Sequence, residues 1–418
     1  MNDTTGFAVA SNGGGEDKKM RLYDEAVLKA DPIVNGGRGY QQCSISVMDT
    51  IADPNISFDD KGICNYYYEY EKAEENDVFK GEKGRAKLSN VISKIKAEGK
   101  NKPYDCILGL SGGADSSYLA WLAKREGLRP LVVHFDYGWN LELAVQNIEN
   151  IIKRLDLNLY TIVMDWEQMR SLQRSYYKSS VLDLDVPADH MIFGALFQTA
   201  KKFGIKHILS GKNVVTEAVL PSAWNYNKFD LVNLKNIHKH FENTYLSRLP
   251  KLGLWQFLYY AGYKRIRSVE LLNYVDYDKK AVKELLQKEL GWRDYGGKHF
   301  ENIYTRFYQS YVLPVKFGID KRKAHLSNLI FSGQMEKEEA LKELSKPPYQ
   351  EGQLVEDLEY VSKKLGFTTG EFIQLINQPN RDHAEFGTDA KQKVLYCNLI
   401  KLASPFTKLL YKIKLLNR

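Results

Sequence analysis

The segment 104–127 constrains the fold more strongly than any other part of the chain. An apolar run at 107–110 ends in a Ser-Gly-Gly turn, and a helical pattern follows at 116–125. This order predicts a strand, a tight turn and a helix, so that backbone N–H groups and a helix N-terminus face one point. Gly112 and Gly113 permit a positive φ and a close approach of the backbone to a ligand. The segment therefore predicts a phosphate-binding loop.

Polar side chains of the same turn supply further groups that a nucleotide site needs. Ser111, Ser116 and Ser117 offer hydroxyl donors, and Asp115 can hold a Mg²⁺ ion that offsets phosphate charge. The alternative is an ordinary strand-to-helix turn built from small residues. The strand, the Ser-Gly-Gly-Ala-Asp-Ser string and the helix coincide, which favours the phosphate site. The Gly-Lys-Ser/Thr ending of the Walker A pattern is missing.

The string 111–117 resembles the PP-loop of the ATP pyrophosphatases. This resemblance implies that ATP is cleaved between its α- and β-phosphates, that AMP is transferred to a substrate oxygen, and that pyrophosphate leaves. The cofactors it implies are ATP and Mg²⁺, with Asp115 in contact with the metal.

Composition sets the class of protein. The chain has 418 residues, which is enough for two or three domains, and its hydrophobic share of 44% is ordinary for a globular protein. A net charge of +7 suits an anionic ligand without requiring nucleic acid. Four cysteines argue against a disulfide framework. Because the sequence has neither a membrane-spanning apolar run nor a signal-peptide layout, we expect a cytoplasmic protein.

Strand and helix patterns alternate after the loop. Nearly continuous apolar runs at 131–136, 160–164 and 206–210 are typical of buried parallel strands. Helical patterns at 167–181 and 189–203 lie between them. We therefore expect an α/β fold with a doubly wound parallel sheet, similar to the PP-loop and adenine nucleotide alpha-hydrolase-like proteins. A small N-terminal cap and a mostly helical C-terminal region complete it.

Composition shifts divide the remainder of the chain. The stretch 218–345 is aromatic and basic, with helical patterns at 252–262 and 277–290 and no clean strand pattern. Residues 76–102 predict an amphipathic helix ahead of the first strand. The five predicted regions are a flexible N-terminal arm (1–38), a small cap (39–100), the PP-loop ATP-binding domain (101–230), a substrate-binding helical region (231–345) and a C-terminal helical region (346–418).

The loop 211–217 is a second candidate ligand site, because doubly wound sheets bind ligands at the carboxyl ends of their strands. It follows a predicted strand directly. Asn213 could orient the phosphates or the substrate, and Glu217 could share a Mg²⁺ ion with Asp115. The alternative is a loop in which Asn213 or Thr216 caps a helix.

His134 and Asp136 end the second predicted strand. In this geometry the adenine typically lies across the ends of the first two strands, so the backbone at Leu110 and His134 could hold it. A lone histidine at a strand end fits a structural role equally well.

Cys43 and Cys64 raise the question of a zinc site. A zinc ribbon needs two Cys-x-x-Cys pairs to complete a tetrahedral site, and here the second members are Ser46 and Tyr67. Two thiolates with no nearby histidine cannot close a structural zinc site. We therefore expect no zinc and interpret the segment as a packed cap with two reduced cysteines.

The block 291–325 is dense in basic and aromatic residues. Arginine grips phosphate or carboxylate bidentately, so the block could cradle a nucleotide-linked or acidic substrate. Nucleic acid would use the same residue types. The alternative is a basic helix face exposed to solvent. It accounts well for the basic run 321–323 but poorly for the Gly-Gly-Lys sequence at 296–298. The basic residues of the block that we single out are Lys298, Arg306, Lys316, Lys321, Arg322 and Lys323.

Residues 41–345 taken together resemble the N-acetyl sugar amidotransferase family, surface-polysaccharide enzymes of the WbpG kind. The family commonly has both complete Cys-x-x-Cys pairs, and this chain departs from it at Ser46 and Tyr67. The strings that carry the resemblance are 47–50, 62–65, 110–117, 292–299 and 316–325, of which the last two are the most specific.

This resemblance implies that a sugar acetamido group is converted to an acetamidino group through an adenylated imidate. The sugar would be nucleotide-linked and destined for lipopolysaccharide O-antigen or a related glycan. Ammonia would come from a glutaminase and a cyclase-like partner protein. The sequence agrees with an external donor, because Asn2 stands where an N-terminal-nucleophile glutaminase needs a cysteine. No nucleic acid is expected as a partner. The basic amphipathic tail 400–418 suggests a docked helix, with peripheral membrane contact as the alternative.

The candidate residues fall into three predicted roles. The predicted catalytic residues are Asp115, Ser116, Glu217 and Lys298. The predicted ATP-binding residues are Leu110, Ser111, Gly112, Gly113, Asp115, Ser116, Ser117, His134, Asp136, Gly211 and Asn213. The predicted substrate-binding residues are Lys298, His299, Arg306, Lys316, Lys321 and Lys323.

Three other functions compete with this one. A PP-loop enzyme that modifies tRNA, by thiolation or lysidine formation, fits the charge, although the cysteines that thiolation usually needs are missing. A non-catalytic nucleotide-binding subunit fits the incomplete cysteine pairs but not the complete string 111–117. An ammonia-dependent synthetase for a small acid, such as NAD or an asparagine-like amide, does not resemble the block 291–325.

Overall fold

The centre of the structure is a parallel five-stranded sheet with the strand order β3-β2-β1-β4-β5. The computed structural model describes residues 39–297, 300–349 and 352–399. The predicted N-terminal arm (1–38) and the predicted amphipathic tail (400–418) lie outside the described residues. The strands are β1 (Cys106–Gly109), β2 (Pro130–Asp136), β3 (Asn158–Val163), β4 (His207–Leu209) and β5 (Arg267–Val269).

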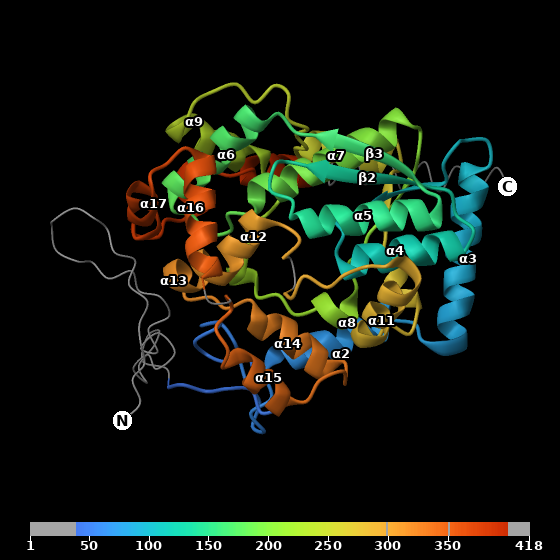
Figure 1. The fold of residues 1–418 in the computed structure, drawn as a ribbon, viewed down its shortest axis with the longest axis horizontal. Helices are drawn as coiled ribbons and strands as arrows, with labels where there is room; N and C mark the ends of the chain where they lie inside the picture. The colour runs from blue at the N-terminus through green and yellow to red at the C-terminus, as the bar shows by residue number, and fades with distance from the viewer. Residues whose placement is uncertain (1–38, 298–299, 350–351, 400–418) are drawn as a thin grey trace.

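Both faces of the sheet are covered, so the predicted doubly wound α/β fold is confirmed. Ile107 and Val133 point into one buried core, whereas Leu108 and Val132 point into the other, as the period of a strand requires. Figure 1 shows α4 and α5 on one side of the sheet and α6 and α7 on the other. The first layer consists of α3 (Gly81–Gly99), α4 (Ala114–Arg125), α5 (Glu142–Leu155) and α11 (Lys279–Leu290); the second consists of α6 (Trp166–Ser179) and α7 (Val186–Lys202), with α9 (Leu231–Phe241) packed on α6.

The sheet edges differ from the expectation. β5 is a strand in a stretch where no strand pattern was recognised, because its three residues are too few to show one and it pairs only with β4. β3 begins at Asn158 rather than Tyr160, and its residues alternate between exposed and half-buried. This alternation is typical of an edge strand rather than of a strand buried on both faces.

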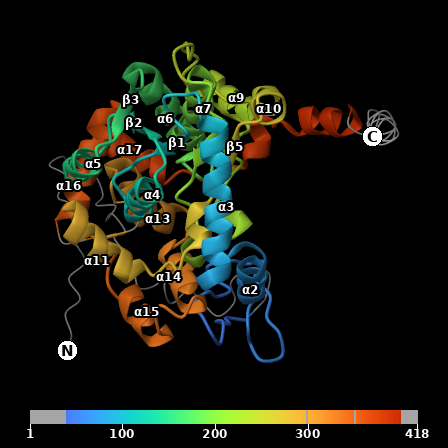
Figure 2. The same cartoon turned by 90° about the vertical axis from the view of Figure 1, so that its right-hand side faces the viewer.

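The cap and a C-terminal helix pair lie side by side. Val47 packs with Leu326 and Ala340, and Lys337 Nζ donates to the carbonyl of Cys43 at 2.6 Å. α3 leads from this cap to the sheet (Figure 2). The helices of this unit are α2 (Asn65–Asp77), α14 (Arg322–Phe331) and α15 (Lys337–Leu344).

The remaining elements are mostly short helices. No helix among the residues that the structure describes combines the length and the apolar character needed to cross a membrane. These elements are α8 (Val214–Glu217), η1 (Ser222–Trp224), α10 (Leu254–Leu258), η2 (Tyr259–Tyr263), η3 (Leu271–Tyr274), α12 (Ile303–Phe307), η4 (Tyr308–Val312), α13 (Leu313–Phe317), α16 (Gln353–Leu365), α17 (Thr369–Ile376) and η5 (His383–Phe386).

Candidate active site

Two adjoining cavities open at the carboxyl ends of β1, β2 and β4, the edge where ligands of doubly wound sheets bind. The large cavity has a volume of about 540 Å³. The small cavity has a volume of about 190 Å³. Ser111, Gly211 and Glu301 line both, so the two form one continuous site.

The turn between β1 and α4 requires glycine. Gly112 has a φ of +83°, and a Cβ atom there would lie 2.6 Å from the carbonyl oxygen of Ala144. Its own carbonyl accepts a hydrogen bond from Trp292 Nε1 at 2.8 Å. The loop is thus held against α5 and the segment after α11, at a position where no larger residue fits.

Serine hydroxyls brace the loop from within. The Oγ atoms of Ser111 and Ser116 lie 3.2 Å apart, and Ser111 Oγ accepts from the N–H of Gly113 at 3.2 Å. Ser117 is fully buried and donates to the Gly113 carbonyl at 2.6 Å. Ser111 and Ser116 therefore face the site, whereas Ser117 supports the loop from behind.

The N-terminus of α4 opens on the small cavity. Its N-cap is Gly113, and no side chain caps it. Ala114, Asp115 and Ser116 of the first turn line the cavity. An uncapped N-terminus of a twelve-residue helix attracts an anion through its N–H groups and its dipole, so this end of the site suits phosphate.

Carboxylates and tyrosines surround the same cavity. The Tyr277 hydroxyl donates to Asp115 Oδ1. Burial and then the Asp115 carboxylate raise the pKa of Tyr277 far above its usual range, so the hydroxyl stays protonated. Burial and then Glu301 act in the same direction on the pKa of Tyr295. Glu217 lines the cavity as well, which places both predicted Mg²⁺ carboxylates in one space.

Two lysines that the sequence analysis missed complete the small cavity. Lys279 and Lys283 lie one helical turn apart on α11 and both line it. Lys283 Nζ also pairs with Asp294 at 2.6 Å. The pattern at 277–290 predicted the helix, but the fold alone brings these lysines beside a loop more than 160 positions earlier.

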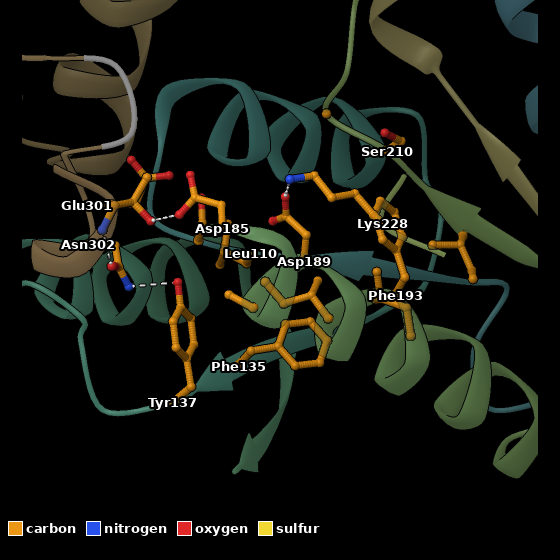
Figure 3. A pocket seen from close by; sticks show the side chains of 18 of the residues that line it. Leu110, Phe135, Tyr137, Asp185, Asp189, Phe193, Ser210, Lys228, Glu301 and Asn302 are labelled. Atoms are coloured by element: carbon orange, nitrogen blue, oxygen red, sulfur yellow. Dashed lines mark hydrogen bonds and ion pairs between the residues drawn. The ribbon is translucent and has the colours of Figure 1, made fainter. Parts of the chain in front are cut away.

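The large cavity has an apolar wall. Leu110 and Phe135, at the ends of β1 and β2, line it together with Ile192, Phe193 and Leu196 of α7. Figure 3 shows Leu110, Phe135 and Phe193 close together. This wall lies beside the strand ends where the adenine was expected.

His134 is fixed at the same place. Its Nδ1 donates to the Leu110 carbonyl at 3.2 Å, and its Nε2 accepts from the Asn140 amide at 3.2 Å. Asp136, in contrast, accepts from the N–H of Gly138 at 2.9 Å and shapes the turn after β2 without lining either cavity.

Another part of the wall of the large cavity is polar (Figure 3). Lys228 Nζ pairs with Asp183 at 2.6 Å and with Asp189 at 3.1 Å. Burial lowers the pKa of Lys228, but the three neighbouring carboxylates outweigh it and raise the pKa overall. Asp185 accepts from Thr305 Oγ1 at 3.2 Å and from Gln309 Nε2 at 3.0 Å. This acidic segment was not predicted from the sequence, where its one signal is the run of aspartates just before Pro187.

Several predicted site residues lie outside both cavities. Asn213 is fully buried and caps α8 by accepting from the N–H of Thr216 at 3.0 Å, which is the structural alternative considered for it. Arg306 forms a buried bidentate pair with Asp357 at 2.8 and 2.7 Å. Lys323 pairs with Asp49 of the cap.

Lys316 is also engaged elsewhere. Its Nζ donates to the carbonyls of Ile376 at 3.0 Å and Gln378 at 2.6 Å, at the end of α17. Burial lowers its pKa to about 8. Basic charges of the block 291–325 therefore mostly satisfy carboxylates and carbonyls of the protein itself. Lys298 and His299 lie outside the described residues.

Lys321 is the predicted substrate-binding residue that the structure brings to the site. It lines the large cavity and also a third cavity of about 350 Å³. Gln309 lines the same two cavities, and Tyr295 joins the third cavity to the small one. The third cavity, which also includes Arg322 and His325, extends the site toward α14.

The cysteine positions of the cap come together as a packed cluster. Cys64 N–H donates to Cys43 Sγ at 3.3 Å, and Ser46 Oγ lies 3.9 Å from Cys64 Sγ. Tyr67 instead packs against Phe331. Among residues 39–297, 300–349 and 352–399, no group of three or more His, Cys, Asp or Glu side chains is placed to hold a metal ion.

Two family models match segments of the chain that contribute to this site. Residues 105–217 match the family described as queuosine biosynthesis protein QueC. Residues 301–400 match the family described as LPS biosynthesis protein WbpG-like, C-terminal domain. A comparison with curated proteins found no match.

Solved structures give weaker likenesses. One is an NH3-dependent NAD synthetase from Campylobacter jejuni in complex with the nitrate ion, with 19% identity, a TM-score of 0.25, and coverage of 31% of this chain and 57% of that one. Another is the NMN synthetase from Francisella tularensis, with 17% identity, a TM-score of 0.26, and coverage of 51% of this chain and 87% of that one.

Proposed function

This chain joins a PP-loop domain of the QueC type to a WbpG-like C-terminal domain, and we propose that it uses ATP to convert the acetamido group of a nucleotide-linked N-acetyl sugar to an acetamidino group. One observation carries the proposal. The PP-loop cavity opens into a cavity to which Asn302, Thr305 and Lys321 of the WbpG-like region contribute. The ATP-activating loop and the region that resembles sugar-modifying enzymes therefore face one shared space.

The shape and charge of the site favour one orientation of ATP. The apolar wall of the large cavity suits the adenine, whereas the N-terminus of α4 and the lysines of α11 suit the β- and γ-phosphates. The α-phosphorus then lies near Ser111 and Gly211, where the two cavities meet. This is the position from which AMP can pass to a group in the large cavity.

The residues fit a Mg²⁺ ion that binds together with ATP. Asp115 and Glu217 line the small cavity, and Mg²⁺ usually takes one or two protein carboxylates with phosphates and waters as its other ligands. When bound, the ion would offset the negative charge of the phosphates.

The proposed reaction has two steps. In the first, the amide oxygen of the sugar attacks the α-phosphorus, the bond from that phosphorus to the β-phosphate oxygen breaks, and pyrophosphate leaves. An O-adenylyl imidate remains, and its nitrogen keeps the amide proton. In the second, ammonia adds to the imidate carbon, one proton leaves the new nitrogen, and the bond from that carbon to the AMP oxygen breaks. The product amidine is cationic.

We also propose that the ammonia comes from a separate glutaminase, with a cyclase-like partner. Glutamine hydrolysis needs a reactive cysteine at a substrate site. Cys43, Cys64 and Cys106 are buried, Cys397 is exposed, and none of the four lines either cavity. This placement supports an external donor. The product would serve a surface glycan such as lipopolysaccharide O-antigen.

The experiment measures pyrophosphate and AMP release from ATP with Mg²⁺ and ammonium, with UDP-linked N-acetylated sugars added one at a time and tRNA added in parallel. We expect release that requires a sugar and yields a product with NH in place of the amide oxygen. Release that requires tRNA would instead establish the tRNA-modifying alternative. Release with neither, under any sugar tested, would contradict the proposal.

A further inference from the structure

We propose that Asp185 accepts the proton of the incoming ammonia and then pairs with the amidinium group of the product. This inference rests on the proposed function, because the amidinium arises only in that reaction. Asp185 lies in the large cavity (Figure 3), on the wall formed by α7 and the WbpG-like region.

The orientation of Asp185 is the first observation. The residue occupies the N-cap position of α7, where an aspartate normally accepts hydrogen bonds from the N–H groups of the first turn. Its side chain makes no such bond. Each carboxylate oxygen instead accepts from a neighbouring side chain that lines the same cavity, Oδ1 from Thr305 and Oδ2 from Gln309. The carboxylate is therefore positioned by the cavity wall rather than by its own helix.

The charge balance around Asp185 is the second observation. Lys228 is bonded to Asp183 and Asp189. Among the residues that the structure describes, no lysine or arginine forms an ion pair with Asp185, although it is 6% exposed. Lys321 and Lys228 act on Asp185 without a direct ion pair, so a ligand that brings positive charge could still pair with its carboxylate.

The neighbouring charges also define its behaviour with pH. Burial raises the pKa of Asp185; the positive charges of Lys321 and Lys228 oppose this, whereas Asp189 and Asp183 add to it. The carboxylate is thus a stronger base than an ordinary aspartate. A base of raised pKa is better suited to take a proton near neutral pH.

The step balances with Asp185 as the base. Ammonia adds its lone pair to the imidate carbon and becomes a protonated amine. One N–H bond breaks and its proton passes to the Asp185 carboxylate, while the electron pair of the bond to the AMP oxygen leaves with AMP. The amidinium that remains carries two N–H groups on one side, which match two carboxylate oxygens. Asp185 first passes this proton to water, so the carboxylate that pairs with the amidinium is ionised again.

The test uses a small product mimic and needs neither ATP nor a sugar. Acetamidinium and acetamide have the same shape and differ in charge, so the ratio of their affinities reports a carboxylate in the site. We expect the wild-type chain to bind acetamidinium about tenfold more tightly than acetamide in NMR titrations. Asp185→Asn should remove this preference. Asp189→Asn, which changes a carboxylate of the same cavity that is paired with Lys228, should retain it.

Each outcome decides the inference. A folded Asp185→Asn protein that keeps the preference would overturn it, as would a wild-type chain without the preference. If the variant does not fold, the wild-type titration decides, because acetamidinium stays charged throughout. The affinity for acetamidinium should then fall as the pH is lowered, with a midpoint above 3.8, the ordinary pKa of aspartate. A midpoint at or below 3.8 would overturn the inference. Failure of sugar-dependent pyrophosphate release is a separate result that concerns the proposed function.

Discussion

Asp115 is the single residue on which the proposed activation of ATP depends most. It lines the phosphate end of the site and accepts a hydrogen bond from Tyr277. We predict that Asp115→Ala lowers pyrophosphate release at least about a hundredfold, since a carboxylate that would hold Mg²⁺ beside the reacting phosphates is lost. Tyr277→Phe keeps the Asp115 carboxylate and removes only the hydroxyl that donates to it, so pyrophosphate release should fall less in this variant. Full AMP formation by Asp115→Ala would show that the carboxylate has no part in the reaction.

Gly112 tests the geometry of the loop itself. A Cβ there would meet the backbone of Ala144, and the positive φ adds strain. Gly112→Ala should reduce the free energy of unfolding by about 1–3 kcal/mol and weaken ATP binding. Gly262→Ala is the matched control, because no atom lies within 4 Å of its added Cβ. Equal thermal stability of the two variants would contradict the loop geometry.

His190 should make stability depend on pH. Its Nδ1 donates to the Lys228 carbonyl, its Nε2 accepts from the N–H of Leu252, and burial lowers its pKa from 6.5 to about 4. Between these values the unfolded chain binds a proton that the folded chain does not, so stability falls as the pH drops from 6.5 to 4. Over this pH range the free energy of unfolding, measured with denaturant, should fall by about 2–3 kcal/mol less in His190→Asn than in the wild type.

Residue-level prediction from sequence succeeded where local geometry determined the role. The loop 111–117 was found because strand, turn and helix are all encoded within a few positions. Arg306 and Lys316 were predicted to bind substrate because basic residues among aromatics resemble a ligand cradle. Their carboxylate and carbonyl partners lie some fifty or sixty positions away in sequence, and only the fold shows that those charges are already satisfied.

At the scale of elements, we expect the lysines of α11 to bind the β- and γ-phosphates, which leave as pyrophosphate. Lys279→Met should raise the KM for ATP about five- to tenfold while the protein remains folded, because a cation facing the phosphates is removed. Lys280→Met provides the control, because Lys280, the next residue, is exposed and does not line the small cavity. Identical KM values for the two variants would remove α11 from the site.

The pair between α12 and α16 is a second prediction at this scale. Removing one partner of a buried ion pair leaves the other charge without compensation. Arg306→Leu should therefore cost about 3–5 kcal/mol of stability, measured by denaturant unfolding, and the double variant with Asp357→Leu should recover most of it. Unchanged stability with lost sugar-dependent activity would instead favour the substrate role that the sequence suggested.

Elements were predicted best where burial is complete. β1 and β2 are nearly continuous apolar runs and were found almost to the residue. The predicted start of β3 was two residues late, because an edge strand mixes exposed and half-buried residues. β5 was not predicted, because three residues are too few to show an alternating pattern. The difference is physical: central strands are specified by their own composition, and edge strands by the neighbour they pair with.

At the scale of the whole molecule, the site is assembled from segments distant in sequence. The PP-loop, α7, α11 and the start of the WbpG-like region all contribute walls. Backbone hydrogen bonds from Leu141 to Glu301 and from Ile303 to Trp139, both 2.9 Å, tie the turn after β2 to the segment before α12. In the proposed function, activation of ATP and selection of the acceptor would share this connected frame, which the sequence could indicate only through its resemblance to a family.

The central claim is that the sugar's amide oxygen is adenylated, and an isotope measurement tests it most directly. A UDP-linked N-acetyl sugar with ¹⁸O in its acetyl carbonyl would be incubated with the protein, ATP, Mg²⁺ and ammonium, and the nucleotide products would be analysed by mass spectrometry. The account predicts the label in AMP, with unlabelled pyrophosphate and a product amidine that has lost the oxygen. Label that remains in the sugar while AMP forms would contradict it.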